Sequence, residues 1–321
     1  MAPPDPAPRL AGEYVLPLRW DDDAGLPELA HYLARLSGWI DVTVVDGSPA
    51  ERFAAHRAAW PFVRHVPPAV TGRNGKARGA MTGIRLARHD KVVIADDDVR
   101  YERRQLADVL DRLDRAALVR PQNVFVPTPW HARWDTGRTL VNRALGGDFS
   151  GTVALRAAAL GEAGYDTDVL FENLELERTV RARGGRVDVA SDVYVVRRPP
   201  EVRRFAEQRV RQAYDDFAQP LRLARELALL PMIGVLVGAR RGASLAAVAV
   251  GVVALAAVGR ARAGGRAQFR PTDCLWALPW MLERAVTVWI AVALRLRGGV
   301  RYRDTRIRRA ATPLHLLRRR A

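Results

Sequence analysis

Short apolar runs alternate with amphipathic stretches along the first hundred residues of the chain. The runs are rich in β-branched side chains and lie at residues 14–18, 42–45, 62–66 and 91–95. This composition is typical of strands that are buried on both faces of a sheet. Residues 26–36 and 76–87 carry apolar side chains at the spacing of one helix face. Strands that alternate with helices form βαβ units, so the pattern predicts an α/β fold with a mostly parallel sheet.

The pattern is less regular in the middle of the chain. Apolar runs predict further strands at 117–126, 152–155 and 187–196. Pro127 and Pro129 predict a break after the first of these strands. A helix is expected over 168–183, because two glycines follow its last turn. Residues 203–217 predict a polar, amphipathic helix that leads into the C-terminal third.

The C-terminal third holds three longer apolar segments, at residues 227–238, 243–258 and 275–294. The first is too short to cross a bilayer comfortably, and the second is close to long enough. The third has the length but carries Glu283 and Arg284 near its centre, so it either spans with partnered charges or lies in the interface. Two spans with an interfacial helix and three spans both fit, and so do core helices of a soluble domain.

The positive charge of the chain is concentrated in the same third. Residues 201–321 hold 23 of the 51 Lys and Arg residues but only 8 of the 35 Asp and Glu residues. Basic residues beside apolar segments favour an anionic membrane surface on the cytoplasmic side. We therefore predict a cell-membrane location, with the α/β domain and the basic tail cytoplasmic. No helix-turn-helix, zinc or RNA-recognition signature accompanies the charge, so no nucleic-acid partner is expected.

These observations divide the chain into four parts. Residues 1–12 are expected to form a disordered leader, and residues 13–200 the α/β domain. Residues 201–225 are expected to form an amphipathic helix next to the membrane. Residues 226–321 would hold the membrane-associated helices and the basic tail.

Three consecutive carboxylates, Asp96, Asp97 and Asp98, follow the apolar run at 91–95. Asp is a poor strand residue and like charges repel, so the cluster fits the end of a strand at the carboxyl edge of an open sheet, where ligands bind. Alternate residues of an extended segment project to the same side, so Asp96 and Asp98 are candidates to hold one divalent cation. Carboxylate oxygens suit Mg²⁺ or Mn²⁺. A solvated acidic turn is the alternative.

Several short motifs accompany this cluster, and they are Val44–Ser48, Gly75–Ala80, Asp96–Asp98, Gly146–Phe149, Phe171–Leu176 and Gln208–Gln212. Their order resembles that of the membrane-associated family-2 glycosyltransferases of GT-A fold, including ceramide-glucosyltransferase-like enzymes. The resemblance covers residues 13–217 by motif and the remainder by hydropathy. It implies a GT-A-like nucleotide-binding domain followed by membrane-associated helices, a divalent metal, and a nucleotide-sugar donor, which in the family is most often a UDP-sugar.

The resemblance also implies roles for single residues. Asp46 would contact the nucleoside, and Lys76 and Asp97 would bind the donor. Gln208 would also bind the donor, and Arg211 would contact its diphosphate, which the geometry of a guanidinium suits.

The general base is the role that cannot be carried over. The family has an aspartate where this chain has Asn173, and an amide does not accept a proton at neutral pH. We assign the base to Glu172, because Glu175 lies on the same helix face and two carboxylates raise one another's pKa. Asp148, in the acceptor-side loop, is the second candidate. Gln212 replaces the tryptophan that ends another family motif, so stacking at that position is lost.

The resulting prediction is an inverting, metal-dependent glycosyltransferase of the hexosyltransferase type. It would move a sugar from a nucleotide-diphosphate donor to a lipid or other membrane-bound acceptor. Asn173 and Gln212 motivate an alternative, a membrane-anchored pseudoenzyme that binds a nucleotide-sugar or a partner without turnover. A nucleotidyltransferase on a similar sheet is the third hypothesis, and it predicts release of pyrophosphate from a nucleoside triphosphate.

Overall fold

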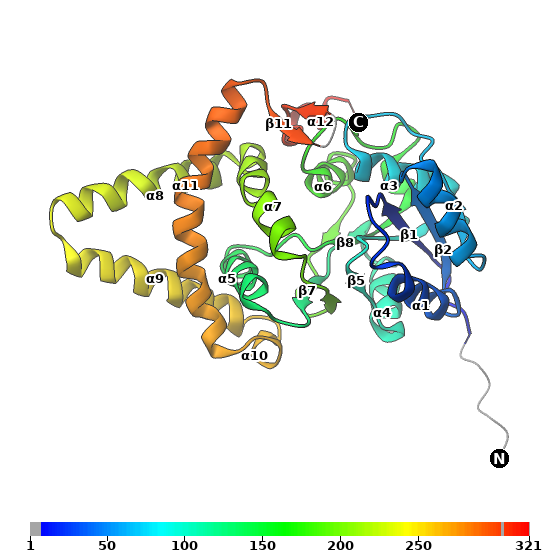
Figure 1. Cartoon of the computed structure of the whole chain (residues 1–321), viewed down its shortest axis with the longest axis horizontal. Helices are drawn as coiled ribbons and strands as arrows, with labels where there is room; N and C mark the ends of the chain where they lie inside the picture. The colour runs from blue at the N-terminus through cyan, green and yellow to red at the C-terminus, as the bar shows by residue number, and fades with distance from the viewer. Residues whose placement is uncertain (1–7, 303–304, 321) are drawn as a thin grey trace, which may run out of the picture.

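The computed structural model describes residues 8–302 and 305–320, and its centre is a seven-stranded sheet (Figure 1). The strand order is β3-β2-β1-β4-β8-β6-β9, and β8 runs antiparallel to both of its neighbours while the other pairs are parallel. These strands are β1 Glu13–Leu18, β2 Asp41–Asp46, β3 Arg64–Val66, β4 Lys91–Ala95, β6 Leu118–Val119, β8 Thr152–Arg156 and β9 Val187–Asp188. The predicted α/β fold with a mostly parallel sheet is confirmed.

Helices cover both faces of this sheet, because successive side chains of a strand point to opposite sides. Tyr14 and Leu16 of β1 pack into a core with α1 and α4, whereas Val15 packs into a second core with α3 and α6. The helices of this domain are α1 Leu26–Ser37, α2 Ala50–Ala59, α3 Gly75–Leu86, α4 Arg103–Arg112 and α6 Glu172–Ala182, with the short helix η1 Ala157–Leu160.

A second sheet of three strands corrects two predictions. Its strands are β5 Val99–Arg100, β10 Tyr194–Arg197 and β7 Gln122–Phe125, in the order β5-β10-β7. The single strands expected over 117–126 and 187–196 each divide between the two sheets, because the chain bends at Pro121 and at the turn around Ser191. The division brings the end of β10 against the turn that follows β4, since Arg197 pairs with Val99.

The helix α5, Trp130–Ala144, is absent from the predictions, which place only a break near its start. Its buried residues include Asp135, Thr139 and Arg143. A helix whose buried face is this polar lacks the apolar periodicity by which amphipathic helices are found. Gly137 lets α5 approach its neighbours closely, since a Cβ at this position would lie 2.4 Å from the backbone carbon of Trp276.

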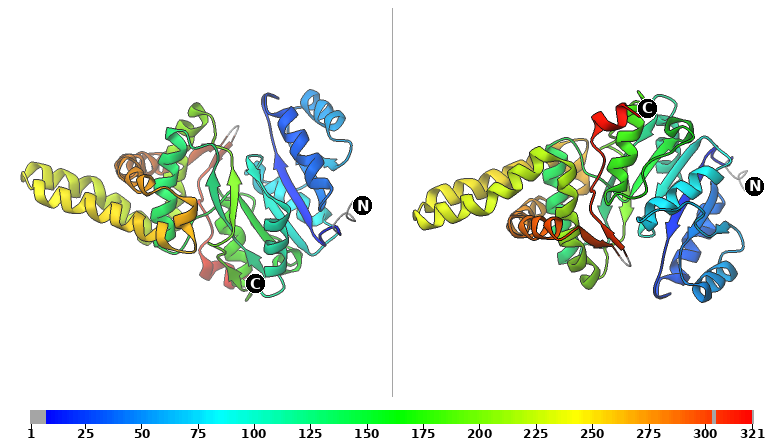
Figure 2. Two further views of the ribbon diagram at one scale, coloured as in Figure 1. Left: turned by 90° about the horizontal axis from the view of Figure 1, so that it is seen from below. Right: turned by 90° about the horizontal axis from the view of Figure 1, so that it is seen from above.

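The C-terminal helices have two arrangements (Figures 1 and 2). α8 and α9 form a hairpin that projects from the body, and α11 runs crosswise at its base. By length and composition, two helices could cross a membrane, Gly242–Ala261 and Pro271–Leu296. The elements here are α7 Val202–Tyr214, η2 Asp215–Ala218, α8 Pro220–Gly238, α9 Gly242–Ala261, α10 Gly265–Gln268, η3 Pro271–Trp276 and α11 Ala277–Leu296.

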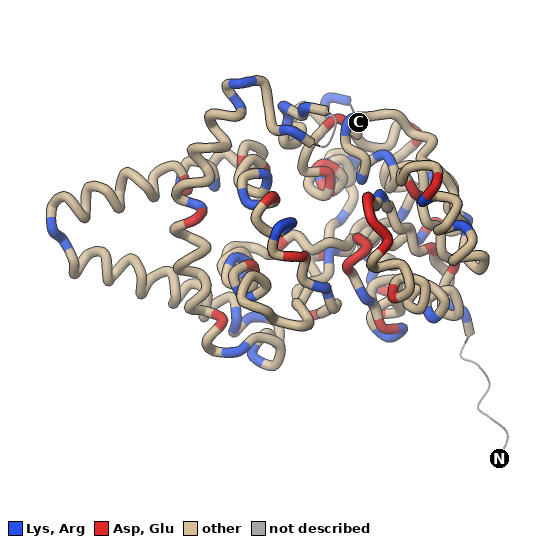
Figure 3. Tube along the Cα trace, in the orientation of Figure 1, with Lys and Arg blue, Asp and Glu red and all other residues tan. Residues whose placement is uncertain are grey.

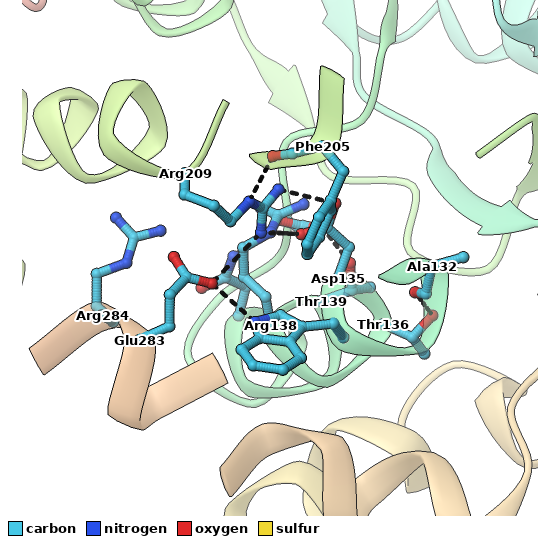
Figure 4. A network of polar contacts seen from close by, with 12 residues as sticks. Ala132, Asp135, Thr136, Arg138, Thr139, Phe205, Arg209, Glu283 and Arg284 are labelled. Carbon is cyan, nitrogen blue, oxygen red and sulfur yellow. Dashed lines mark hydrogen bonds and ion pairs between the residues drawn. The ribbon is translucent and has the colours of Figure 1, made fainter. Parts of the chain in front are cut away.

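Both charges at the centre of α11 have partners in the globular body. Glu283 lies 3.6 Å from Arg209, and Arg209 makes two hydrogen bonds to Asp135, at 2.7 and 3.2 Å (Figure 4). Arg284 is buried and lies 2.8 Å from Asp216. Since buried charges need such partners, the polar face of α11 is held by α5, α7 and the turn after α7.

The first and last described segments of the chain contact the α/β domain. Leu10, within the predicted leader, donates its N–H to the carbonyl of Trp39 at 2.7 Å, while residues 1–7 lie outside the described residues. The basic tail forms β11 Val300–Tyr302, β12 Thr305–Ile307 and α12 Leu314–Arg318, and α12 packs on α6. The N–H groups of Leu170 and Phe171 donate to carbonyls of residues 309 and 310 at 3.0 and 2.8 Å. The tail therefore belongs structurally with the α/β domain.

Candidate active site

The acidic turn after β4 faces a large cleft at the carboxyl edge of the main sheet. The cleft has a volume of about 1730 Å³ and is lined by this turn together with parts of α3, α6, α7, α11 and β11. β4 ends at Ala95, so Asp96, Asp97 and Asp98 lie beyond the strand, where they line the cleft. Asp97 accepts a hydrogen bond from the indole of Trp20 at 2.5 Å, so this pair forms one wall of the cleft.

Two cations hold the other two aspartates. The Nζ of Lys76 lies 2.6 Å from Asp96 Oδ1 and 2.8 Å from Glu172 Oε1. The guanidinium of Arg197 donates to Asp98 Oδ2 at 2.9 Å and to Asp96 Oδ2 at 3.4 Å. The structure thus brings the predicted metal ligands Asp96 and Asp98 close together. Lys76, which is predicted to bind the nucleotide-sugar donor, lies beside them.

The two aspartates differ in acidity because their surroundings differ. Burial acts to raise the pKa of Asp96, but Lys76 and then Arg197 outweigh it and lower the pKa below its ordinary value. Burial raises the pKa of Asp98 to about 6; Arg197 opposes the rise, while Asp96 and Asp97 add to it. A carboxyl with this pKa is largely ionised at neutral pH, and a nearby cation favours the ionised form further.

The residues present fit a divalent metal. Asp98 Oδ1 is buried and has no hydrogen-bond partner among the residues that the structure describes. A buried carboxylate oxygen without a partner is costly unless a ligand satisfies it. Asp96 and Asp98 together offer the hard oxygen donors that Mg²⁺ and Mn²⁺ take.

Asp46 does not reach the cleft, contrary to the prediction that it contacts the nucleoside. Its Oδ2 lies 2.6 Å from His56 Nδ1 and 3.0 Å from His65 Nε2, and its Oδ1 accepts the N–H of Ser48 at 2.8 Å. Burial acts to raise its pKa, but the hydrogen bonds from His65, Ser48 and His56 lower it to about 2. The carboxylate and the two imidazoles lie within 4.8 Å of one another, but these hydrogen bonds already satisfy the carboxylate. The carboxylate of Asp46 is therefore satisfied within the fold, and its two sequence neighbours line the cleft.

The two glutamates of α6 face different surroundings. Glu172 opens the helix and lines the cleft beside Lys76. Glu175 is fully buried and accepts the N–H of Thr312 at 2.5 Å. Burial is the main cause of the raised pKa of Glu175, followed by the charge of Asp166. Glu172 is thus the one of the two that faces the cleft.

The carboxylate of Asp148, the second candidate base, already has three hydrogen-bond donors. Its carboxylate accepts hydrogen bonds from Arg138 at 2.9 Å, Thr139 at 2.7 Å and Asn142 at 2.7 Å. Burial acts to raise its pKa, but Arg138 and the other donors lower it overall. A carboxylate that is this well satisfied is a poor proton acceptor, and its contacts instead fix the loop before β8 to α5.

One face of α7 and the turn after it lines the cleft. Gln208, Arg211 and Asp215 follow one another at helical spacing, and all three lie on the cleft wall. The guanidinium of Arg211 lies over the ring of Tyr302, 5.4 Å from its centre. Burial raises the pKa of Asp215 to about 8, and Oδ1 of this residue has no hydrogen-bond partner within the described chain.

Three residues of this cleft, Trp20, Arg197 and Asp215, are absent from the sequence predictions. Arg197 lies at the end of one apolar run, and the acidic turn follows another. No local sequence feature links Arg197 to aspartates about a hundred residues earlier. Asp215 lies four residues beyond Arg211, and that helical spacing is the only signal that places it near the cleft. Trp20 has no sequence signal that we can identify.

Comparison with solved structures establishes a GT-A-like fold. The mannosyltransferase PcManGT from Pyrobaculum calidifontis, solved in complex with GDP-Man and Mn²⁺, matches 89% of this chain and 89% of its own, with a TM-score of 0.53 and 21% sequence identity. Two weaker matches are TarS from S. aureus in complex with UDP-GlcNAc, with 14% identity over 61% of each chain and a TM-score of 0.43, and glucosyl-3-phosphoglycerate synthase from Mycobacterium tuberculosis, with 15% identity over 61% and 75% of the two chains and a TM-score of 0.40. No protein-family model and no curated protein matches the sequence. At 21% identity, the similarity to PcManGT is a similarity of fold.

Proposed function

We propose that this protein is an inverting glycosyltransferase that transfers a hexosyl group from a nucleotide-diphosphate sugar to a lipid acceptor, with Mg²⁺ or Mn²⁺ as cofactor. The observation that carries the proposal is the convergence of Asp96, Asp98, Lys76 and Glu172 at the carboxyl edge of the sheet. The shared fold with a mannosyltransferase that binds GDP-Man and Mn²⁺ supports it. Both UDP and GDP are therefore candidate donor nucleotides.

The residues of the cleft suit the departure of a diphosphate. A metal held by Asp96 and Asp98 would neutralise charge on the leaving group. Arg211 faces the same cleft, and a guanidinium binds two phosphate oxygens at once. Gln208, one turn earlier on α7, adds an amide that can donate to the same group.

Glu172 is the proposed general base. Its carboxylate lines the cleft and shares the ammonium of Lys76 with Asp96, so Lys76 bridges the proposed base and the proposed metal site. Asn173 follows it on the cleft wall and can orient an acceptor hydroxyl by hydrogen bonding. An acceptor deprotonated there would attack the sugar from the side opposite the diphosphate, which inverts the anomeric centre.

The hairpin of α8 and α9 suits a bilayer. α9 has 20 residues and is about 30 Å long, which equals the thickness of the hydrocarbon core. Large apolar side chains are exposed on both helices, among them Val235 on α8 and Val250 and Val258 on α9. Arg240 and Arg241 lie at the turn between the helices, where they would meet the far headgroups (Figure 3).

The attachment of α11 supports an interfacial position for this helix, beside the hairpin of α8 and α9. Gly137 packs on the backbone of Trp276 and Ala277 at its start, and the tail that follows its end packs on α6. Because both ends contact the same domain, this helix fits the membrane surface, with Leu282 and Trp289 exposed towards the lipid. The cleft and the basic tail then lie on one side, which we propose is the cytoplasmic side of the cell membrane.

The position of the cleft supports a lipid acceptor. Arg222 of α8 and Arg284 and Leu294 of α11 line it together with the acidic turn. The cleft thus extends from the predicted donor site to the helices that would touch the bilayer. An acceptor headgroup can enter it while the lipid chain stays in the membrane.

The test uses full-length protein in lipid nanodiscs with Mn²⁺, UDP- and GDP-sugars and a lipid extract, and it measures free nucleoside diphosphate and label in the lipid. We expect metal-dependent release that is lost in Asp98→Asn. It should persist in Asp114→Asn, a control at an exposed aspartate paired with Lys91. Binding without release would favour the pseudoenzyme, and pyrophosphate from a nucleoside triphosphate would favour the nucleotidyltransferase. A protein that binds neither UDP nor GDP with Mn²⁺ would refute the proposal.

A further inference from the structure

We propose that Arg197 couples metal binding to diphosphate binding, an inference that rests on the proposed function. Without a metal, its guanidinium occupies the two aspartates that would be the ligands. With these oxygens engaged by a metal, the guanidinium of Arg197 would contact the diphosphate of the donor instead. Metal and nucleotide would then each strengthen the binding of the other.

The backbone places Arg197 firmly at this position. It is the last residue of β10, where it pairs with Val99 in the second sheet. The next residue donates its N–H to the carbonyl of Asp98 at 2.7 Å. Gly151 closes the other side, since a Cβ there would lie 2.8 Å from Asp96 Oδ2 and 3.1 Å from Arg197 Cζ. The side chain is therefore the part of Arg197 that is free to change partners.

The carboxylate oxygens of Asp96 and Asp98 are nearly all in use. Both oxygens of Asp96 contact a cation, Lys76 on one side and Arg197 on the other. Asp98 Oδ2 also contacts Arg197, and only its Oδ1 is without a partner in the described chain. A metal bound through both side chains must therefore displace cationic contacts or share oxygens with them. Either way, the fixed positive charge of Arg197 opposes a divalent ion at this distance.

Lys76 and Arg197 would differ in the ion-pair partners that they keep when a metal binds Asp96 and Asp98. Lys76 keeps its second partner, Glu172, at 2.8 Å. In the part of the chain that the structure describes, the carboxylates paired with Arg197 are those of Asp96 and Asp98. Arg197 thus loses its partners to the metal, and about a fifth of its side chain is exposed to the cleft. A diphosphate bound to the metal offers adjacent oxygens in the geometry that a guanidinium prefers.

The consequence is a thermodynamic coupling. Metal alone competes with Arg197, whereas metal with a diphosphate gives Arg197 a new partner. The factor by which nucleotide tightens metal binding must equal the factor by which metal tightens nucleotide binding. Free metal would then bind weakly, and the complete site would form chiefly when the donor is present.

The experiment is calorimetric titration of Mn²⁺ into the full-length protein in nanodiscs, with and without saturating UDP or GDP. For wild type we expect nucleotide to tighten Mn²⁺ binding by about tenfold or more, the effect of one neighbouring unit charge. Arg197→Gln should bind Mn²⁺ alone about tenfold more tightly than wild type, and its coupling should be about tenfold weaker, because only the direct attraction between metal and diphosphate remains. Arg197→Lys keeps the charge, so its binding of Mn²⁺ alone should remain weak.

The matched control is Arg198→Gln, which removes the same charge one residue away. Arg198 pairs with Glu28 at 2.8 Å and should leave both Mn²⁺ titrations close to wild type. Equal affinity of Arg197→Gln and wild type for Mn²⁺ alone, or equal coupling in both, would overturn the inference. A wild type that binds Mn²⁺ but no nucleoside diphosphate would instead refute the proposed function. Tighter binding of Mn²⁺ by Arg197→Gln would in that case still support the competition at the aspartates.

Discussion

Replacing Gly259 by alanine tests how tightly the apolar hairpin is joined to the globular body. Gly259 lies near the end of α9, where that helix crosses α5. A Cβ here would lie 1.8 Å from the carbonyl oxygen of Leu140, whereas real Cβ atoms essentially never approach closer than 3.0 Å. The obstacle is backbone, so the two helices must separate locally by about 1.2 Å, the difference between these distances.

The cost follows from what this separation disturbs. Leu140, Ala256 and Trp280 belong to the core cluster at this crossing, and Arg143 donates to the carbonyl of Gly259 at 3.1 Å. Overpacking of a core costs about 1–3 kcal/mol and a lost hydrogen bond about 1 kcal/mol, so we expect a loss of about 2–4 kcal/mol. With an unfolding entropy of about 2 cal/mol/K per residue, the Tm of a chain of 321 residues should fall by about 3–6 °C.

Gly251→Ala is the matched control on the same helix. No atom lies within 4 Å of a Cβ at that position, so alanine should leave the Tm unchanged or raise it slightly through its better helix propensity. Thermal unfolding in detergent, followed by tryptophan fluorescence, gives both values. Equal Tm values for the two variants would refute the close crossing of α5 and α9.

Three further predictions concern buried or cleft carboxylates. Asp135→Asn leaves Arg209 buried with only the more distant Glu283, so it should lower the free energy of unfolding by about 3–5 kcal/mol in denaturant titrations; an unchanged midpoint would mean that Glu283 suffices. Because burial raises the pKa of Asp215 to about 8, the native state binds more protons than the unfolded state between its ordinary pKa and pH 8. Stability should therefore fall as pH rises through this window, and Asp215→Asn should reduce that dependence when Tm is compared at pH 5 and 8, leaving the share that the raised pKa of Asp98 contributes. Glu172→Gln should keep metal-dependent nucleotide binding and lose about hundredfold or more in transfer rate, whereas normal turnover would assign the base to another residue.

The first four parallel strands of the main sheet were predictable because their signals are local, whereas α2 was not predicted. Strands such as β1 and β2 are short runs buried on both faces, and their observed bounds differ from the predicted runs by a residue or so at each end. The second sheet was not predictable, because the division of 117–126 and 187–196 depends on which distant strand each half pairs with. α5 escaped prediction because the partners of its buried polar residues come from elsewhere in the chain.

The same distinction applies to the site. Asp96 and Asp98 stand out in sequence because adjacent carboxylates at a strand end are unfavourable without a ligand or cations to hold them. Arg197, which holds them, is recognisable only once β10 is paired with β5. Asp46 differs from its prediction, since its motif implied contact with the nucleoside while two histidines from α2 and β3 contact its carboxylate.

The contact between the tail and α6 sets an order of events during synthesis. Glu172 opens α6 directly after Leu170 and Phe171, whose N–H groups are satisfied by residues 309 and 310. Those residues leave the ribosome after α8, α9 and α11, so the start of α6 gains its final contacts only when the apolar segments have already emerged. A nascent chain that ends at α11 would hold the aspartates but not the finished wall beside Glu172. The cleft can therefore be completed only after α8, α9 and α11 have left the ribosome.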